Sequence, residues 1–219
     1  PGRMIFVKRT LCWAAGLLAA ACAGGQELPA PDESPDDAPA WAFSVSAAVY
    51  VVKDDRDFFQ PTLMADRDWL HLEARYSYEN LDTGSVWVGY NFAGEGAVDW
   101  SVTPMLGGVF GRTTGVSPGY RGALHWWRLD LFSEGQYVVD AADTDDNFFY
   151  NWSELSLSPA EWFRFGLAAQ RTRVYRSDLD TQRGFLVGVA WATASLTAYV
   201  FNPEDDDERL FVISLGVEF

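Results

Sequence analysis

The sequence predicts an all-β protein, an antiparallel up-and-down transmembrane β-barrel of about twelve strands. Three observations lead to this fold class. Polar and apolar side chains alternate in about twelve short segments, the connections between these segments alternate in length, and aromatic residues gather at the segment ends. Transmembrane barrels show this pattern because residues that face the lipid alternate along each strand with residues that face the interior.

The bulk composition is compatible with this fold class. The 219 residues are 48% hydrophobic and 16% aromatic, yet the mean hydropathy is only -0.09. Alternation hides the apolar face of a barrel from such an average. Outside the N-terminal region, no apolar run approaches the ~20 residues that a membrane helix needs.

Residues 1–23 are typical of a secretory signal peptide. Lys8 and Arg9 supply the positive region, and the apolar stretch 11–21 is too short to span a membrane as a helix. We expect cleavage after Ala23, which leaves a mature chain without cysteine or disulfide. Lipidation of Cys22, which follows a loose lipoprotein-type pattern, is an open alternative.

Residues 24–40 are rich in Pro, Asp and Glu and offer little to bury, so we expect a disordered acidic periplasmic leader before a barrel at 41–219. The formal net charge is -15. Removal of residues 1–23, which contain basic but no acidic residues, makes it more negative. This charge argues against nucleic acid as a partner and favours small cationic solutes or divalent ions.

The clearest strand is the segment Trp69–Asn80. Leu70, Leu72 and Ala74 fall on one face together with two tyrosines, whereas the charged side chains fall on the other. A helix would scatter these charges around its circumference, but a strand separates them completely.

The same test finds eleven further strands, although ten or eight strands in total remain possible. They are expected at 41–52, 58–65, 85–92, 98–110, 121–127, 129–139, 148–157, 161–176, 183–192, 195–202 and 209–219. The least certain boundary is at Arg128, where one long strand or two strands joined by a tight turn both fit the pattern.

The connections between these segments fall into two alternating sets. Short ones are expected at 65–68, 93–97, 128, 158–160 and 193–194, and longer acidic ones at 53–57, 80–84, 111–122, 140–147, 177–182 and 203–208. Transmembrane barrels carry short turns on one side and longer loops on the other. A turn at Arg128 preserves this alternation, which favours twelve strands.

The aromatic residues follow the same division and predict two girdles at the membrane interfaces. The short-turn end receives Trp41, Trp69, Phe92, Trp100, Trp126, Trp162, Trp191 and Phe219. The long-loop end receives Tyr50, Tyr78, Phe110, Tyr137, Phe149, Tyr175 and Phe201.

The segment Leu210–Phe219 resembles the C-terminal signal strand of bacterial outer-membrane β-barrel proteins, a class that includes porins. Phe211, Ile213, Leu215 and Val217 form one apolar face that ends in the aromatic Phe219. The resemblance implies an integral, multi-pass location in the outer membrane, in contact with its lipids and lipopolysaccharide. It also implies that the barrel-assembly machinery recognises the strand ending at Phe219.

Arg171 and Arg173 fall on the outward face near the long-loop end. There they would meet lipopolysaccharide phosphates, whereas a β-bulge that shifts the strand phase would turn them inward.

Charged residues set which face of each strand points inward, because Arg or Lys facing lipid at mid-membrane costs ~2–4 kcal/mol. The expected lumen-lining residues are His71, Glu73, Arg75, Glu79, Asp130, Glu134, Gln136, Glu154, Arg164 and Gln170. Acidic residues prevail in this set, so one interpretation is a narrow channel that favours cations or small polar solutes. The alternative is a non-conducting structural or adhesion barrel whose lumen is plugged by paired charges.

An enzymatic function is not expected, and we predict no catalytic residues, no metal site and no cofactor. An outer-membrane lipid hydrolase would require a nucleophile beside a base. The two histidines, His71 and His125, have no serine close along their strands. Two separated histidines and a mature chain without cysteine also offer no recognisable metal ligand set.

Overall fold

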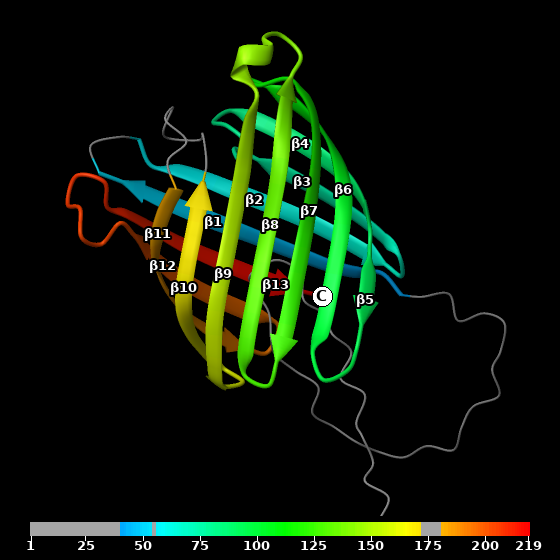
Figure 1. The fold of residues 1–219 in the computed structure, drawn as a ribbon, viewed down its shortest axis with the longest axis vertical. Helices are drawn as coiled ribbons and strands as arrows, with labels where there is room; N and C mark the ends of the chain where they lie inside the picture. The colour runs from blue at the N-terminus through cyan, green and yellow to red at the C-terminus, as the bar shows by residue number, and fades with distance from the viewer. Residues whose placement is uncertain (1–39, 54–55, 172–180) are drawn as a thin grey trace, which may run out of the picture.

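A computed structural model describes residues 40–53, 56–171 and 181–219, which form one closed antiparallel β-barrel (Figure 1). The expected signal peptide and nearly all of the expected leader lie outside these residues. The strands are β1 (Ala42–Val52), β2 (Phe58–Arg67), β3 (Leu70–Tyr76), β4 (Thr83–Tyr90), β5 (Phe92–Gly94), β6 (Asp99–Gly111), β7 (Gly115–Trp126), β8 (Leu129–Asp140), β9 (Phe148–Ala160), β10 (Phe163–Arg171), β11 (Thr181–Trp191), β12 (Ala194–Phe201) and β13 (Leu210–Glu218). One 3-10 turn, η1 (Thr144–Asp146), lies at the tip of the β8–β9 hairpin.

Each strand pairs with its sequence neighbours, and the pairing of β1 with β13 closes the cylinder. The strands β4 and β5 both pair with β6 in one register, with Gly89 opposite Met105 and Phe92 opposite Val102. They are therefore one barrel strand interrupted at Asn91. The prediction of twelve strands is confirmed, and so is the turn at Arg128 between β7 and β8.

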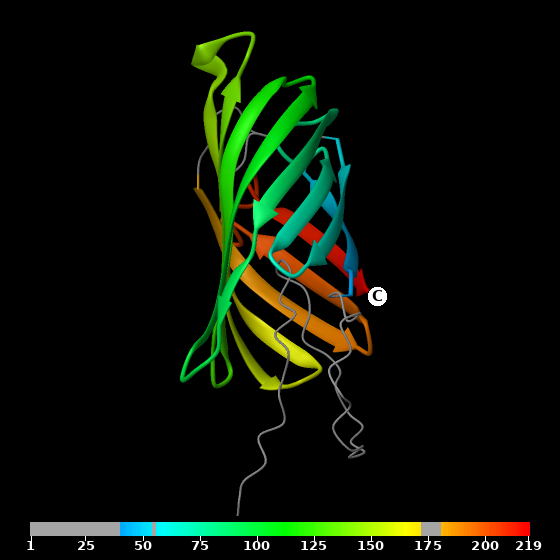
Figure 2. The same cartoon turned by 90° about the vertical axis from the view of Figure 1, so that its right-hand side faces the viewer.

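Exposure alternates along the strands and separates an apolar outer surface from a polar interior. In β11, Phe185 and Val187 are 54% and 51% exposed, whereas Leu186 between them is 1% exposed. Figure 2 shows the strands strongly inclined within the two opposite walls, as barrel closure requires. Within the described residues, no helix is long and apolar enough to cross a membrane.

All eight aromatic residues expected at the short-turn end are exposed at the ends of their strands. Two of them stack on neighbouring rings, Phe219 on Phe43 with ring centroids 6.1 Å apart and Trp69 on Tyr90 at 5.3 Å. This end therefore carries the expected exposed aromatic rings.

The expected girdle at the long-loop end is partly wrong. Phe110, Tyr137 and Phe149 point outward, but Tyr50 and Phe201 are 3% and 0% exposed. They belong to an aromatic cluster inside the barrel, made of Tyr50, Phe58, Phe148, Tyr150, Trp152, Tyr199 and Phe201. These rings fill the interior near the long loops, where the barrel would otherwise contain a void. Tyr175 lies outside the described residues.

Two expected boundaries are also wrong. The expected strand 69–80 ends at Tyr76, because Ser77 and Asp82 adopt left-handed φ values of 52° and 55° that fold the chain into a turn. Tyr78 consequently packs inside the barrel against Tyr150, with ring centroids 5.0 Å apart. The expected long loop 111–122 is a short connection, since β7 begins at Gly115.

Candidate functional site

The alternating sequence of β3 turns three charged side chains into the barrel. His71, Glu73 and Arg75 are 2%, 4% and 5% exposed, and Leu72 between them faces outward. Buried charges require partners, because an unpaired charge in a low-dielectric interior is strongly destabilising. Those partners come from β3 itself and from the interior side chains of β2, β7 and β8.

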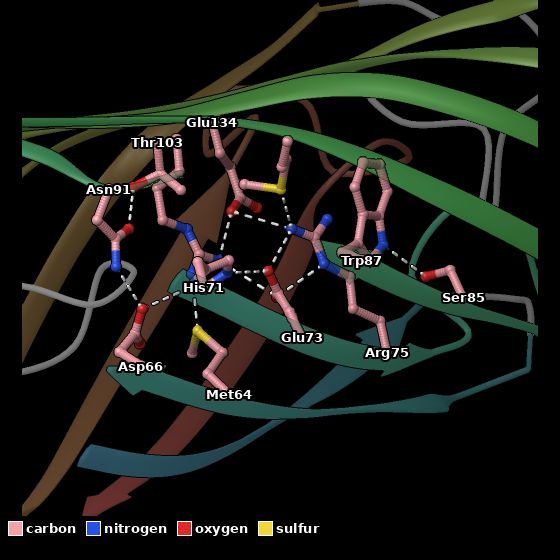
Figure 3. Close-up of polar contacts among 12 residues, drawn as sticks. Met64, Asp66, His71, Glu73, Arg75, Ser85, Trp87, Asn91, Thr103 and Glu134 are labelled. Atoms are coloured by element: carbon pink, nitrogen blue, oxygen red, sulfur yellow. Dashed lines mark hydrogen bonds and ion pairs between the residues drawn. The ribbon is translucent and has the colours of Figure 1, made fainter. Parts of the chain in front are cut away.

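The centre of the interior is a group of ion pairs that we call the charge cluster: Glu73, Arg75, Arg121 and Glu134. Arg75 donates to both carboxylate oxygens of Glu73, from Nε at 2.7 Å and from Nη2 at 3.0 Å. The Nη2 of Arg121 donates to Glu73 at 3.3 Å and to Glu134 at 3.0 Å. Figure 3 shows Glu73 and Arg75 of β3 beside Glu134 of β8.

Hydrogen bonds extend the charge cluster toward the short-turn end. The His71 ring contacts Glu73 through Nε2 at 3.2 Å and Asp66 through Nδ1 at 2.7 Å. Asn91 donates to Asp66 at 2.8 Å and accepts from Thr103 at 2.7 Å (Figure 3). The break between β4 and β5 therefore lies where Asn91 joins this chain of contacts.

A second extension runs toward the long-loop end. Arg75 donates from Nη1 to Gln136 at 2.9 Å, and Gln136 donates to Glu79 at 3.3 Å. Glu79 also accepts from Ser85 at 2.7 Å. Glu79 is fully buried although it lies in the 77–82 turn rather than in the expected strand.

The Arg75 guanidinium lies between two aromatic rings. Its Cζ atom is 4.4 Å from the ring centroid of Tyr78 and 4.7 Å from that of Trp87. A cation over a ring face is attracted by the ring quadrupole. The rings therefore help to hold Arg75 in the orientation that binds Glu73 and Gln136.

A separate ion pair lies on the opposite wall. Arg164 donates to Glu154 at 2.9 Å and to Thr197 at 3.1 Å. The other oxygen of Glu154 accepts from Trp152 and from Tyr199, each at 2.8 Å. This pair lies beside the aromatic cluster and accepts hydrogen bonds from two of its members, Trp152 and Tyr199.

The ten expected lumen residues thus divide into groups. His71, Glu73, Arg75, Glu79, Glu134 and Gln136 come together, Glu154 pairs with Arg164, and the other two lie apart. Asp130 contacts His125 and accepts from Ser158 at 2.8 Å, and Gln170 donates to Gln182 at 3.0 Å. Nine of the ten are buried, and the side chain of Arg164 is 18% exposed.

Arg121 is not among the residues expected to line the lumen, because it lies where the expected loop 111–122 overlaps the expected strand 121–127. The alternation in this segment contained the signal, because Val116 and Tyr120 are exposed while Ser117 and Arg121 are buried. Asp66 is also absent from the expected lumen residues. The sequence predicts that this strand ends at residue 65, whereas β2 extends to Arg67.

The contacts of His71 bear on the hypothesis of a lipid hydrolase. Both ring nitrogens of His71 contact carboxylates, so in this geometry the ring does not act as the base for a serine nucleophile. In the parts of the chain that the structure describes, no group of three or more His, Cys, Asp or Glu side chains could hold a metal ion.

Side chains fill most of the interior, and one cavity of about 80 Å³ lies beside the charge cluster. Its lining includes Arg121, Glu134, Glu154, Tyr150, Trp152 and Tyr199. Pockets for drug-sized ligands measure roughly 300–1,000 Å³, so this cavity suits only a small molecule or a few waters.

Comparison with solved structures finds a similar fold in a porin. The KdgM porin in complex with disordered oligogalacturonate and the KdgM porin alone each give a TM-score of 0.54 at 10% sequence identity, covering 80% of this chain and 99% of theirs. The chain has the fold of an outer-membrane porin barrel. The Acinetobacter baumannii outer membrane protein Omp33 gives a TM-score of 0.47 at 9% identity, covering 82% of this chain and 98% of its own. No family model matches the sequence, and no curated protein matches it significantly.

Proposed function

We propose that this protein is an integral outer-membrane barrel that passes small polar solutes, and that the charge cluster forms its narrowest section. The observation that carries the proposal is the polar interior of a closed barrel with an apolar outer surface. Replacing buried ion pairs by well-packed apolar residues is often neutral or stabilising. Stability alone therefore gives no reason for five carboxylates and two guanidinium groups among the buried side chains of the described residues.

The balance of these charges favours cations. The buried acids are Glu73, Glu79, Asp130, Glu134 and Glu154, against the buried bases Arg75 and Arg121. A low-dielectric wall with excess negative charge raises the local concentration of cations and repels anions. We expect any conductance to be cation-selective.

Planar-bilayer recordings test both the proposed conductance and the proposed cation selectivity. Wild-type protein should conduct, and the reversal potential across a KCl gradient should show preference for K⁺. Replacing Glu73 and Glu134 with Gln should reduce that preference, because it leaves two guanidinium groups without their carboxylates. Glu95→Gln is the control, since it makes the same kind of substitution, with loss of one carboxylate, at an exposed turn. Anion preference in the wild type, or an equal effect of the control, would refute the electrostatic part.

A non-conducting structural barrel is the second candidate, and a specific observation favours it. Hydrogen bonds cross the lumen directly, from Arg75 on β3 to Gln136 on β8 and from Arg121 on β7 to the Met64 sulfur on β2 at 2.7 Å. Together with the small cavity, these contacts describe a lumen occupied by paired side chains. Absence of conductance from correctly folded wild-type protein would establish this structural role over the channel.

A further inference from the structure

The small cavity has an aromatic wall and an acidic wall. Tyr50, Tyr150, Trp152 and Tyr199 contribute rings from the aromatic cluster, and Tyr78 adds a fifth ring from the turn after β3. The Glu134 and Glu154 carboxylates form the acidic wall, and the Arg121 guanidinium, which donates to Glu134 at 3.0 Å, lines the cavity beside them. Rings and carboxylates together are the surroundings that stabilise an organic cation, because ring faces and anions both attract positive charge.

Ring faces in this interior already hold a cation. The Arg75 guanidinium lies over Tyr78 and Trp87 at 4.4 and 4.7 Å from their centroids. The same Tyr78 lines the cavity. The local geometry is thus suited to cation–π contact with a second positive group.

The charges around the cavity leave a negative excess. Glu134 and Arg121 line the cavity and belong to a wider network, in which four acidic side chains (Asp66, Glu73, Glu79, Glu134) outnumber three basic ones (His71, Arg75, Arg121) by one. Consistent with this, Oε2 of Glu79 is buried without a hydrogen-bond partner in the described structure. One monovalent cation would balance the group.

A polar atom at the cavity is only weakly satisfied. Tyr150 is 1% exposed, and its hydroxyl interacts with the Glu134 carboxylate but makes no hydrogen bond of good geometry among the described residues. A buried hydroxyl without a partner is destabilising unless water or a ligand satisfies it. This atom therefore points to an occupant of the cavity.

We propose that the cavity binds a small organic ammonium ion, with the ring faces against its alkyl groups and Glu134 nearest its charge. The proposal rests on the proposed function and names the class of solute. A volume of about 80 Å³ holds roughly three waters, which limits the ligand to a few heavy atoms. A weakly hydrated ammonium ion exchanges water for ring faces more readily than a strongly hydrated inorganic ion does.

Calorimetric titration of the folded, detergent-solubilised barrel with tetramethylammonium chloride tests the proposal without requiring conductance. Saturable binding is expected for tetramethylammonium, and none for tert-butanol, an uncharged molecule of similar shape. Equal binding of tert-butanol would overturn the assignment to a cation, and absence of tetramethylammonium binding would overturn the site itself.

Two neighbouring tyrosines provide the matched variants. Tyr78→Leu removes a ring from the cavity and should weaken tetramethylammonium binding about tenfold. Tyr76→Leu removes an outward ring that is 48% exposed and should leave binding unchanged. Unaltered binding in Tyr78→Leu would exclude the cavity as the site. Glu134→Gln, which keeps the shape of the side chain, should also weaken binding, and heat-shifted migration on gels verifies that each variant is folded.

The proposed binding site and the proposed channel can be refuted independently. Tetramethylammonium binding without any conductance would support the site and refute the channel. Conductance that is indifferent to tetramethylammonium, together with absent binding, would support the channel and refute the site.

Discussion

Substitution of Gly107 by alanine tests how the interior of the barrel is packed. A Cβ atom at Gly107 would lie 2.5 to 2.7 Å from three ring atoms of Trp87, closer than real Cβ contacts. The ring cannot move aside freely. Its Nε1 donates to Ser85 at 2.9 Å, and the Arg75 guanidinium lies over its face. On its edge, a Cβ atom added at Gly119 would lie 3.2 Å from the ring, so the backbone there leaves little room.

The expected magnitude follows from overpacking. Inserting a methyl group into a well-packed interior destabilises a protein by about 1–3 kcal/mol. With a urea dependence of roughly 2 kcal/mol per M, a loss of about 2 kcal/mol lowers the unfolding midpoint by about 1 M. Gly108→Ala is the control, because a Cβ at Gly108 meets nothing within 4 Å. We expect that variant to stay within roughly 0.5 kcal/mol of the wild type.

Urea unfolding of the barrel in lipid vesicles, followed by tryptophan fluorescence, measures both midpoints. Displacement of Trp87 should also disturb Arg75, so the ion selectivity of Gly107→Ala should change while that of Gly108→Ala should not. Equal midpoints for the two variants would show that Trp87 is not confined as the contacts indicate, and would refute the packing argument.

Three further predictions concern location, assembly and the charge cluster. The protein should fractionate with the outer membrane and migrate faster on gels when unboiled; release as a soluble periplasmic protein would contradict this. The backbone of Phe219 exchanges hydrogen bonds of 2.9 and 3.0 Å with Phe43. Deleting Phe219 should therefore reduce the fraction of protein that shows heat-shifted migration far more than Asp206→Ala does. Equal fractions would refute the proposed role of Phe219 in assembly. Arg121→Gln should strengthen cation preference and destabilise the barrel by about 3–5 kcal/mol, whereas Arg112→Gln at an exposed turn should do neither. The reversal potential measures the change in selectivity, and the midpoint of urea unfolding measures the change in stability.

The sequence by itself determined the fold class and most strand positions. Alternation in β3, β11 and β13 is readable locally, because lipid and interior impose opposite demands on adjacent side chains. The same local rule placed His71, Glu73, Arg75, Glu134 and Glu154 on interior faces. Turns between strands were readable where their residues differ sharply from the strands, as at Arg128.

The tertiary structure decided which interior side chains meet. Arg121 contacts Glu73 and Glu134 because the curvature of the barrel and the strand register turn the interior face of β7 toward that of β3, which lies three strands away, and neither curvature nor register is encoded in a local pattern. Tyr78 turns inward because Ser77 adopts a left-handed φ of 52°, a conformation that the alternation of the preceding strand does not predict. Whether the lumen is filled depends on side chains from opposite walls together, and their separation is set by the closed barrel rather than by any one strand.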